Sequence, residues 1–140
     1  MFRKILVAYD GSEGSKKALR TGIELAKRLE VDLSSISVQE GLPYFAATVG
    51  EVEEVKNDVE AFFKKITKEA WDEAALHGVN LHTTVLPGHE VETVINFAKE
   101  GRFDLLIVGF VGHSNVFGRI MGGTTQNLSR LSPCTVMIVK

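Results

Sequence analysis

Residues 105–125 read LLIVGFVGHSNVFGRIMGGTT, a continuous apolar run that leads into a glycine-rich loop and a polar helix start. Four of the glycines are Gly109, Gly112, Gly122 and Gly123. Glycine lets backbone N–H groups approach a phosphate closely, and a helix N-terminus adds partial positive charge. One pair of glycines after a strand is more often a plain turn. Four in one window favour a nucleotide held by its phosphates at the mouth of an α/β sheet.

Strand and helix patterns alternate along the rest of the chain, which favours a parallel sheet with crossover helices. The predicted strands are residues 5–9, 32–38, 80–86, 105–108 and 135–140, and the predicted helices are residues 15–29, 51–77, 90–100 and 124–131. This order predicts a five-stranded, doubly wound parallel sheet with helices on both faces. Ligands bind such sheets at the carboxyl ends of the strands, where strand order reverses. If the first and fourth strands flank that reversal, Asp10 and Gly109 face one crevice.

Three helices carry more detailed expectations. The predicted helix 51–77 has an apolar stripe that keeps a three-four step throughout. Its members are Val52, Val55, Val59, Phe62, Phe63, Ile66, Ala70 and Ala74. The last helix is expected to take Thr124 or Thr125 as its N-cap. At the first helix, Asp10 alone is more often a cap than a ligand contact, and Ser12 competes for the capping role.

The composition is that of one globular domain of 140 residues. A net charge of -2 without a block of Lys or Arg argues against general nucleic-acid binding. The single cysteine, Cys134, cannot form a disulfide within the chain, which fits an intracellular location. No apolar segment approaches the ~20 residues of a membrane span. We expect a soluble, cytoplasmic protein with no membrane partner.

Several site classes are missing from the sequence. It has no Walker-type phosphate loop and no G-x-G-x-x-G after the first strand. His77, His82 and His89 lack metal-ligand spacing. No His or Glu is placed as an obvious base for an attacking water. These gaps favour nucleotide binding over an efficient hydrolase.

Nearly the whole chain resembles the universal stress protein family. The resemblance rests on KILVAYDGSEGSKKAL at 4–19, GHEVETVINFAKE at 88–100, DLLIVGFVGHSN at 104–115 and LSRLSPCTVMIVK at 128–140. The family's nucleotide-binding branch spaces its loop as G, two residues, G, nine residues, G and then Ser or Thr. Gly109, Gly112 and Gly122 fall at these spacings, whereas Gly123 replaces the hydroxyl residue. Glu90 stands where the family often has Pro, which affects a helix start and not the pocket.

The resemblance implies a Rossmann-like fold of the adenine-nucleotide α-hydrolase type, with strand order 3-2-1-4-5. It also implies ATP, or ADP or AMP, as the ligand, with Mg²⁺ or Mn²⁺ carried on the phosphates. Asp10 would bond a ribose hydroxyl or face the metal, and Val38 would meet adenine through its backbone. The full set expected to bind nucleotide is Ala8, Tyr9, Asp10, Val38, Val108, Gly109, Gly112, His113, Gly122, Gly123, Thr124 and Thr125.

The C-terminal strand is expected to mediate dimerisation. It begins at Thr135 and runs to Lys140, is largely apolar, and can present an unpaired edge. The family resemblance implies that it pairs with its own copy across a two-fold axis. Val136, Ile138 and the loop residues Leu42, Tyr44 and Phe45 are the expected contacts.

Three functions stay open from the sequence. The first is a stress-response regulatory module whose bound ATP changes its shape or its choice of partner. The second is a slow ATPase or nucleotidyl-transfer enzyme that uses Asp10 and a bound metal. The third is a partner-binding homodimer without nucleotide, which the loss of a hydroxyl at Gly123 would permit.

Overall fold

The computed structural model describes residues 1–41, 49–111 and 121–140 of the chain. Its strands are β1 (Ile5–Ala8), β2 (Leu33–Gln39), β3 (Leu81–Pro87), β4 (Leu105–Gly109) and β5 (Thr135–Val139). The helices are α1 (Glu13–Leu29), α2 (Val49–Leu76), α3 (Glu90–Glu100) and α4 (Gly123–Leu131). Strands and helices alternate as the sequence predicts, with each predicted boundary within two residues of the observed one.

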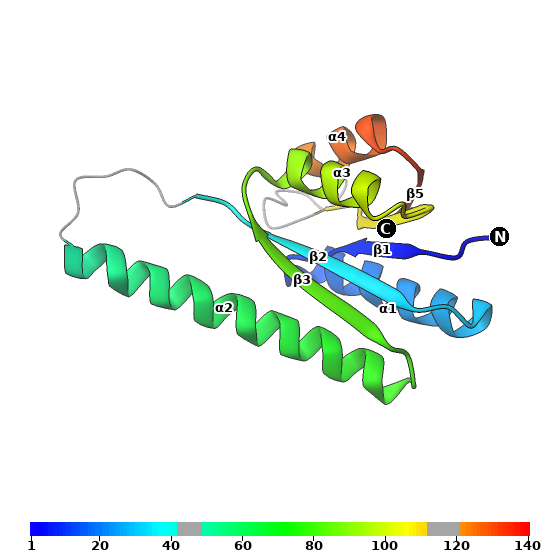
Figure 1. Cartoon of the computed structure of the whole chain (residues 1–140), viewed down its shortest axis with the longest axis horizontal. Helices are drawn as coiled ribbons and strands as arrows, with labels where there is room; N and C mark the ends of the chain where they lie inside the picture. Colours follow the sequence, from blue (N-terminus) through cyan, green and yellow to red (C-terminus); the bar gives the residue numbers. More distant parts are fainter. Residues whose placement is uncertain (42–48, 112–120) are drawn as a thin grey trace.

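The five strands form one sheet in the order β3-β2-β1-β4-β5. All four neighbouring pairs are parallel, and Figure 1 shows the strands running through the middle of the molecule. Parallel neighbours need crossover connections, which α1 to α4 supply. The predicted fold class and strand order are therefore confirmed.

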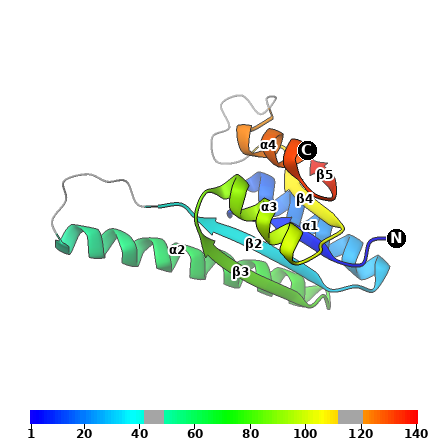
Figure 2. The same ribbon diagram turned by 45° about the horizontal axis from the view of Figure 1, so that its top comes forward.

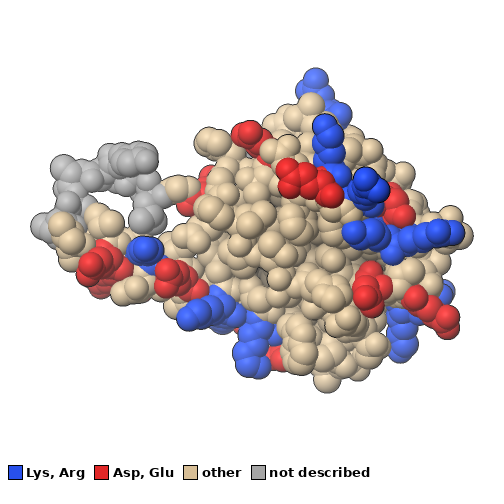
Figure 3. Space-filling view, viewed as in Figure 1, with Lys and Arg blue, Asp and Glu red and all other residues tan. Residues whose placement is uncertain are grey.

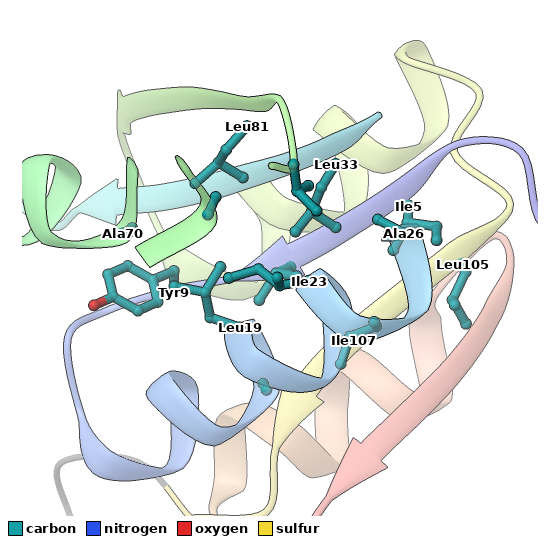
Figure 4. Packing of buried hydrophobic residues seen from close by; sticks show 14 of the residues in the cluster. Ile5, Tyr9, Leu19, Ile23, Ala26, Leu33, Ala70, Leu81, Leu105 and Ile107 are labelled. Atoms are coloured by element: carbon teal, nitrogen blue, oxygen red, sulfur yellow. The ribbon is translucent and has the colours of Figure 1, made fainter. Parts of the chain in front are cut away.

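Side-chain alternation along the strands builds one hydrophobic core on each face of the sheet. Ile5 and Val7 point to the face covered by α1 and α2, together with Ile23 and Leu33. Leu6 points to the opposite face, where α3 and α4 supply partners such as Leu128. Figure 2 shows the two helical layers, and Figure 4 shows the packing under α1. Because both faces are covered, the central strands read as continuous apolar runs.

The apolar stripe of α2 is buried over only part of its length. Ile66, Ala70 and Ala74 are buried against the sheet. Val52 and Val55 are 44% and 45% exposed, because the N-terminal half of α2 extends past the sheet (Figure 1). At 1.5 Å per residue the helix spans about 40 Å, which exceeds the length of any strand it could cover.

The N-cap expected for α4 was wrong. Gly122 is the N-cap residue, and it offers no side-chain bond to the helix. Thr124 and Thr125 lie inside the first turn. Within the described ranges, no helix is both long enough and apolar enough to cross a membrane.

Candidate functional site

The candidate site lies where the strand order reverses, at the carboxyl ends of β1 and β4. These two strands are parallel neighbours, with Val7 opposite Ile107. From β1 the chain continues outward to β2 and β3, whereas from β4 it continues to β5 on the other side. Asp10 and Gly109 therefore emerge at the same edge of the sheet, as the sequence analysis anticipated. Ligands of open α/β sheets bind at such a switch point.

A compact turn connects β1 to α1 at this edge. Ser12 is the N-cap of α1, and its Oγ accepts a hydrogen bond from the Ser15 N–H at 3.2 Å. Asp10 Oδ1 accepts from the Ser12 N–H at 2.9 Å. Ser12, the competing residue, therefore caps the helix, while Asp10 orders the turn before it. This arrangement holds the half-buried Asp10 carboxylate at the mouth of the crevice.

The start of α4 is tied to the end of β4 by two hydrogen bonds. The buried Thr125 donates its hydroxyl to the Gly109 carbonyl at 2.6 Å, and the Gly122 N–H donates to the Phe110 carbonyl at 3.0 Å. The first N–H groups of an α-helix have no partner within the helix, and Gly122 supplies no side-chain acceptor for them. The N-terminus of α4 thus presents backbone donors and partial positive charge beside β4.

Gly109 has a structural reason to be glycine that the sequence analysis missed. A Cβ at Gly109 would lie 2.6 Å from the backbone carbon of Gly14, and a Cβ at Gly14 would lie 1.9 Å from the Val111 carbonyl oxygen. The chain after β4 therefore crosses the first turn of α1 with backbone against backbone. One feature of the sequence could have indicated this contact. Gly14 lies in the first turn of α1, and glycine is otherwise unfavourable in a helix.

Val38 occupies the position at which a backbone contact to a ligand is feasible. Tyr9 donates its N–H to the Ile36 carbonyl at 3.0 Å, so the even-numbered residues of β2 direct their backbone groups toward β1. Because β1 ends at Ala8, the N–H and C=O of Val38 point past its end. The half-buried Ala8 side chain packs on the α3–α4 face of the same edge.

Tyr9 and Val108 face inward and not toward the crevice. The Tyr9 side chain is 4% exposed and packs in the core beneath α1 and α2 (Figure 4). Burial, followed by the charges of Glu69 and Asp10, raises the pKa of Tyr9 to about 12. The phenol is therefore neutral at physiological pH. Val108 is 2% exposed and belongs to the opposite core, which leaves both residues only their backbone for contact with a ligand.

Four site residues remain to be placed. Gly123 and Thr124 lie in the first turn of α4, and a Cβ added at Gly123 would meet none of the described residues within 4 Å. Gly112 and His113 lie outside the described residues. In the described ranges, no group of three or more His, Cys, Asp or Glu side chains could hold a metal ion.

Comparison with known proteins gives three consistent findings. A sequence model of the Universal stress protein family matches residues 1–140. Universal stress protein YxiE of Bacillus subtilis is 34% identical over 148 residues, which cover 100% of both chains. The structure of universal stress protein UspA from Lactobacillus plantarum matches with a TM-score of 0.86 at 23% identity, covering 99% of this chain and 98% of that one.

A further solved structure is that of a universal stress protein in complex with cAMP. It matches with a TM-score of 0.73 at 26% identity, covering 99% of this chain and 97% of the other.

Proposed function

The chain belongs to the universal stress protein family, and on that premise we propose that it is a regulatory module that binds ATP or a related adenine nucleotide. The nucleotide would lie across the carboxyl ends of β1 and β4. Its phosphates would reach the N-terminus of α4. The function is to bind the nucleotide and not to hydrolyse it rapidly. The bound nucleotide determines the shape of this stress-response protein or its choice of partner.

The observation that carries the proposal is the start of α4. This helix begins at the switch point of the sheet, and its N-cap, Gly122, leaves the first-turn N–H groups without a side-chain acceptor. A phosphate at this position accepts hydrogen bonds from those groups and interacts favourably with the helix dipole. Gly123 and Thr124 supply the donors, and the Thr125 hydroxyl holds the helix in place.

The adenosine part of the ligand is assigned to the β1–β2 side of the crevice. Backbone donors and acceptors beyond the end of β1, at Val38, would read the adenine edge. Asp10 would accept from a ribose hydroxyl. The related protein solved with cAMP also carries an adenine nucleotide, which supports this class of ligand.

The residues present fit a metal that is held mainly by phosphate oxygens. Mg²⁺ keeps several waters and is typically bound by one or two carboxylates together with substrate phosphates. Asp10 would be that carboxylate in the alternative in which it faces the metal and not the ribose hydroxyl. Such a metal needs no cluster of protein ligands. Such a metal would neutralise phosphate charge at the helix N-terminus.

We further propose a cytoplasmic homodimer formed through β5. The single cysteine suits a reducing compartment. β5 is an end strand of the sheet, and Phe110 N–H donates to the Val139 carbonyl on its inner side at 2.9 Å. The alternation then turns the backbone groups of Val136 and Ile138 outward, toward a second copy. The loop residues Leu42, Tyr44 and Phe45, also expected at this interface, lie outside the described residues.

The test is a calorimetric titration of nucleotide-free protein with ATP, ADP, AMP, cAMP and GTP in the presence of Mg²⁺. We expect saturable binding of adenine nucleotides and weaker binding of GTP. Gly122→Val places a branched side chain at the phosphate position and should weaken ATP binding by about tenfold or more, ~1.4 kcal/mol.

Gly50→Val is the matched control, because Gly50 lies at the exposed start of α2 with nothing within 4 Å of an added Cβ. Equal ATP affinity of the Gly122 and Gly50 variants would remove α4 from the site. Release of phosphate from ATP that depends on Asp10 would show instead that the protein is a slow hydrolase.

A further inference from the structure

A groove opens between the second half of α2 and strand β3, away from the nucleotide crevice. Its volume is ≈ 590 Å³, and its walls include Phe63, Lys64, Lys68 and Trp71 on α2 with Thr83 and Val85 on β3. Most of the surface exposed in the groove is apolar, although the polar residues Gln39, Glu60 and Thr67 also line it. Trp71 and Val85 are 53% and 37% exposed, which is high for side chains of this kind. Figure 3 shows a broad charge-free area over β2 and β3 on this side of the molecule.

The β3 wall of the groove is a free sheet edge. β3 is the end strand of the sheet. Leu33 N–H donates to the Asn80 carbonyl at 3.1 Å and Gly88 N–H donates to the Gln39 carbonyl at 3.0 Å. The even-numbered residues of β3 therefore bond to β2, and the N–H and C=O groups of Thr83 and Val85 point away from the sheet.

This edge lacks most of the devices that normally protect one. Exposed edge strands are usually short, charged or interrupted, because their free backbone groups pair readily with other chains. Leu81–Pro87 carries no Lys, Arg, Asp or Glu, and its only interruption is the proline at its end. The groove thus combines free backbone partners with apolar side-chain contacts, as do the sites at which extended peptides add a strand to a sheet.

The charged residues on the α2 wall indicate which charge a ligand of the groove should carry. Lys64 and Lys68 lie one helical turn apart on this wall. Lys68 pairs with Asp72 at 2.7 Å, whereas Lys64 has no ion-pair partner among the described residues. Glu60 lies one turn before Lys64 on the same wall. A ligand carboxylate would therefore be attracted at the Lys64–Lys68 end and repelled near Glu60.

We propose that the α2–β3 groove docks an extended peptide segment of a partner protein. The peptide adds a strand to the free edge of β3 and places an apolar side chain against Phe63 and Trp71. One acidic residue of the peptide pairs with Lys64. This site shares no described residue with the nucleotide crevice, so it stands or falls independently of the proposed nucleotide function.

Trp71 is the only tryptophan of the chain, which makes its fluorescence a reporter of the groove. The probe is a synthetic peptide of alternating valine and threonine with one glutamate. We expect a saturable shift of Trp71 emission to shorter wavelength. Replacing the glutamate by lysine, or N-methylating the peptide amides that face β3, should weaken binding at least tenfold. N-methylation of the opposite amides should leave binding unchanged.

Two variants of the protein sharpen the test. Val85→Pro removes an outward N–H and no bond of the β2–β3 ladder, and edge strands tolerate such a proline. Lys64→Glu should reverse the preference, so that the lysine peptide binds better than the glutamate peptide. Leu131→Ala is the control, because Leu131 is 60% exposed on α4. Lys64→Glu and the N-methylated peptides keep the test decisive even if Val85→Pro unfolds.

Several results would overturn the proposal. They are an unchanged Trp71 emission at millimolar peptide, binding that is indifferent to N-methylation, or an unaltered preference in Lys64→Glu. A change of Trp71 emission with protein concentration alone, abolished by Val85→Pro, would show that β3 pairs with a second copy and not with a partner peptide.

Discussion

At the scale of single residues, glycines that look alike in the sequence have different physical roles. Gly109 and Gly14 are glycines because two backbone segments touch there, and any side chain would strike main-chain atoms. Gly123 has no neighbour within 4 Å of an added Cβ in the part of the chain that the structure describes. It therefore accepts other residues, and its effect on the ligand is separable from its effect on the fold. Gly122 has a third role as the N-cap of α4.

Gly14→Ala is predicted to destabilise the protein although alanine favours helix. The added methyl would lie 1.9 Å from the Val111 carbonyl oxygen, and relieving such a contact costs on the order of 1–3 kcal/mol. That exceeds the gain of about 1 kcal/mol from helix propensity. Urea denaturation should give a lower free energy of unfolding than for the wild type.

Gly50→Ala provides the comparison in α2. Nothing lies within 4 Å of its added Cβ, so the same substitution should stabilise the protein by roughly 0.5–1 kcal/mol. If Gly14→Ala stabilised the protein as Gly50→Ala does, the chain after β4 would not cross the first turn of α1 as described.

The residue scale is also where the sequence was least informative about packing. Spacing singled out Gly109 as a ligand-binding glycine, but its contact with Gly14 joins positions far apart in the chain and leaves no local pattern. Tyr9 was expected among the nucleotide-binding residues, and its side chain lies in the core. Alternation in a strand places neighbours on opposite faces, yet it does not tell which face a strand-end residue takes.

At the scale of elements, α4 matters because its N-terminus is held against the end of β4. The Thr125 hydroxyl donates to the Gly109 carbonyl at 2.6 Å, and Thr125 is buried. The same region explains the wrong N-cap. Thr and Ser are common caps, but here the Thr125 hydroxyl bonds to the end of β4 and the cap is Gly122.

Thr125→Val is predicted to lower both stability and ATP affinity. It leaves the half-buried Gly109 carbonyl without this donor, which costs at most about 1–3 kcal/mol, and it frees the helix start that is proposed to bind phosphate. Chemical denaturation and calorimetry would measure the two effects. Thr125→Ser should restore much of both. Thr124→Val, on the neighbouring half-buried residue, should change stability far less. An equal stability loss in Thr124→Val would contradict the assigned tether.

Helix α2 shows what periodicity can and cannot predict. Apolar spacing correctly indicated a long helix and the buried residues Ile66, Ala70 and Ala74. The same stripe includes Val52 and Val55, which are exposed on the part of α2 that extends past the sheet. A stripe reports that one face is apolar, whereas what covers that face depends on the length and position of the neighbouring strands.

At the scale of the whole molecule, the order β3-β2-β1-β4-β5 determines where each surface lies. It brings the ends of β1 and β4 together as a crevice and leaves β3 and β5 as the two edges. Alternating strand and helix patterns were sufficient to predict the sheet, because right-handed crossovers leave few alternatives. The order itself rested on resemblance to a known family, since periodicity alone does not order strands.

The β5 edge is predicted to carry the homodimer. Sedimentation at micromolar concentration should give twice the mass of the chain. Val136→Pro should shift the protein toward monomer, because it removes an N–H that faces outward from β5 and spares the bonds to β4. Val85→Pro is the matched change on the opposite edge and should leave the dimer intact. A monomeric mass for the unaltered protein would contradict the β5 interface.

The most direct test of the central claim is the affinity of Gly123→Asp for ATP, compared with its affinity for adenosine. The new carboxylate has room and favours a helix N-terminus by about 0.3–1 kcal/mol, so stability should hold or rise. A phosphate at the same place would be repelled. ATP binding by Gly123→Asp should weaken by more than about tenfold, ~1.4 kcal/mol. Adenosine binding should be unchanged, and Gly123→Ser should still bind ATP. Undiminished ATP binding by Gly123→Asp would contradict the placement of phosphate at α4.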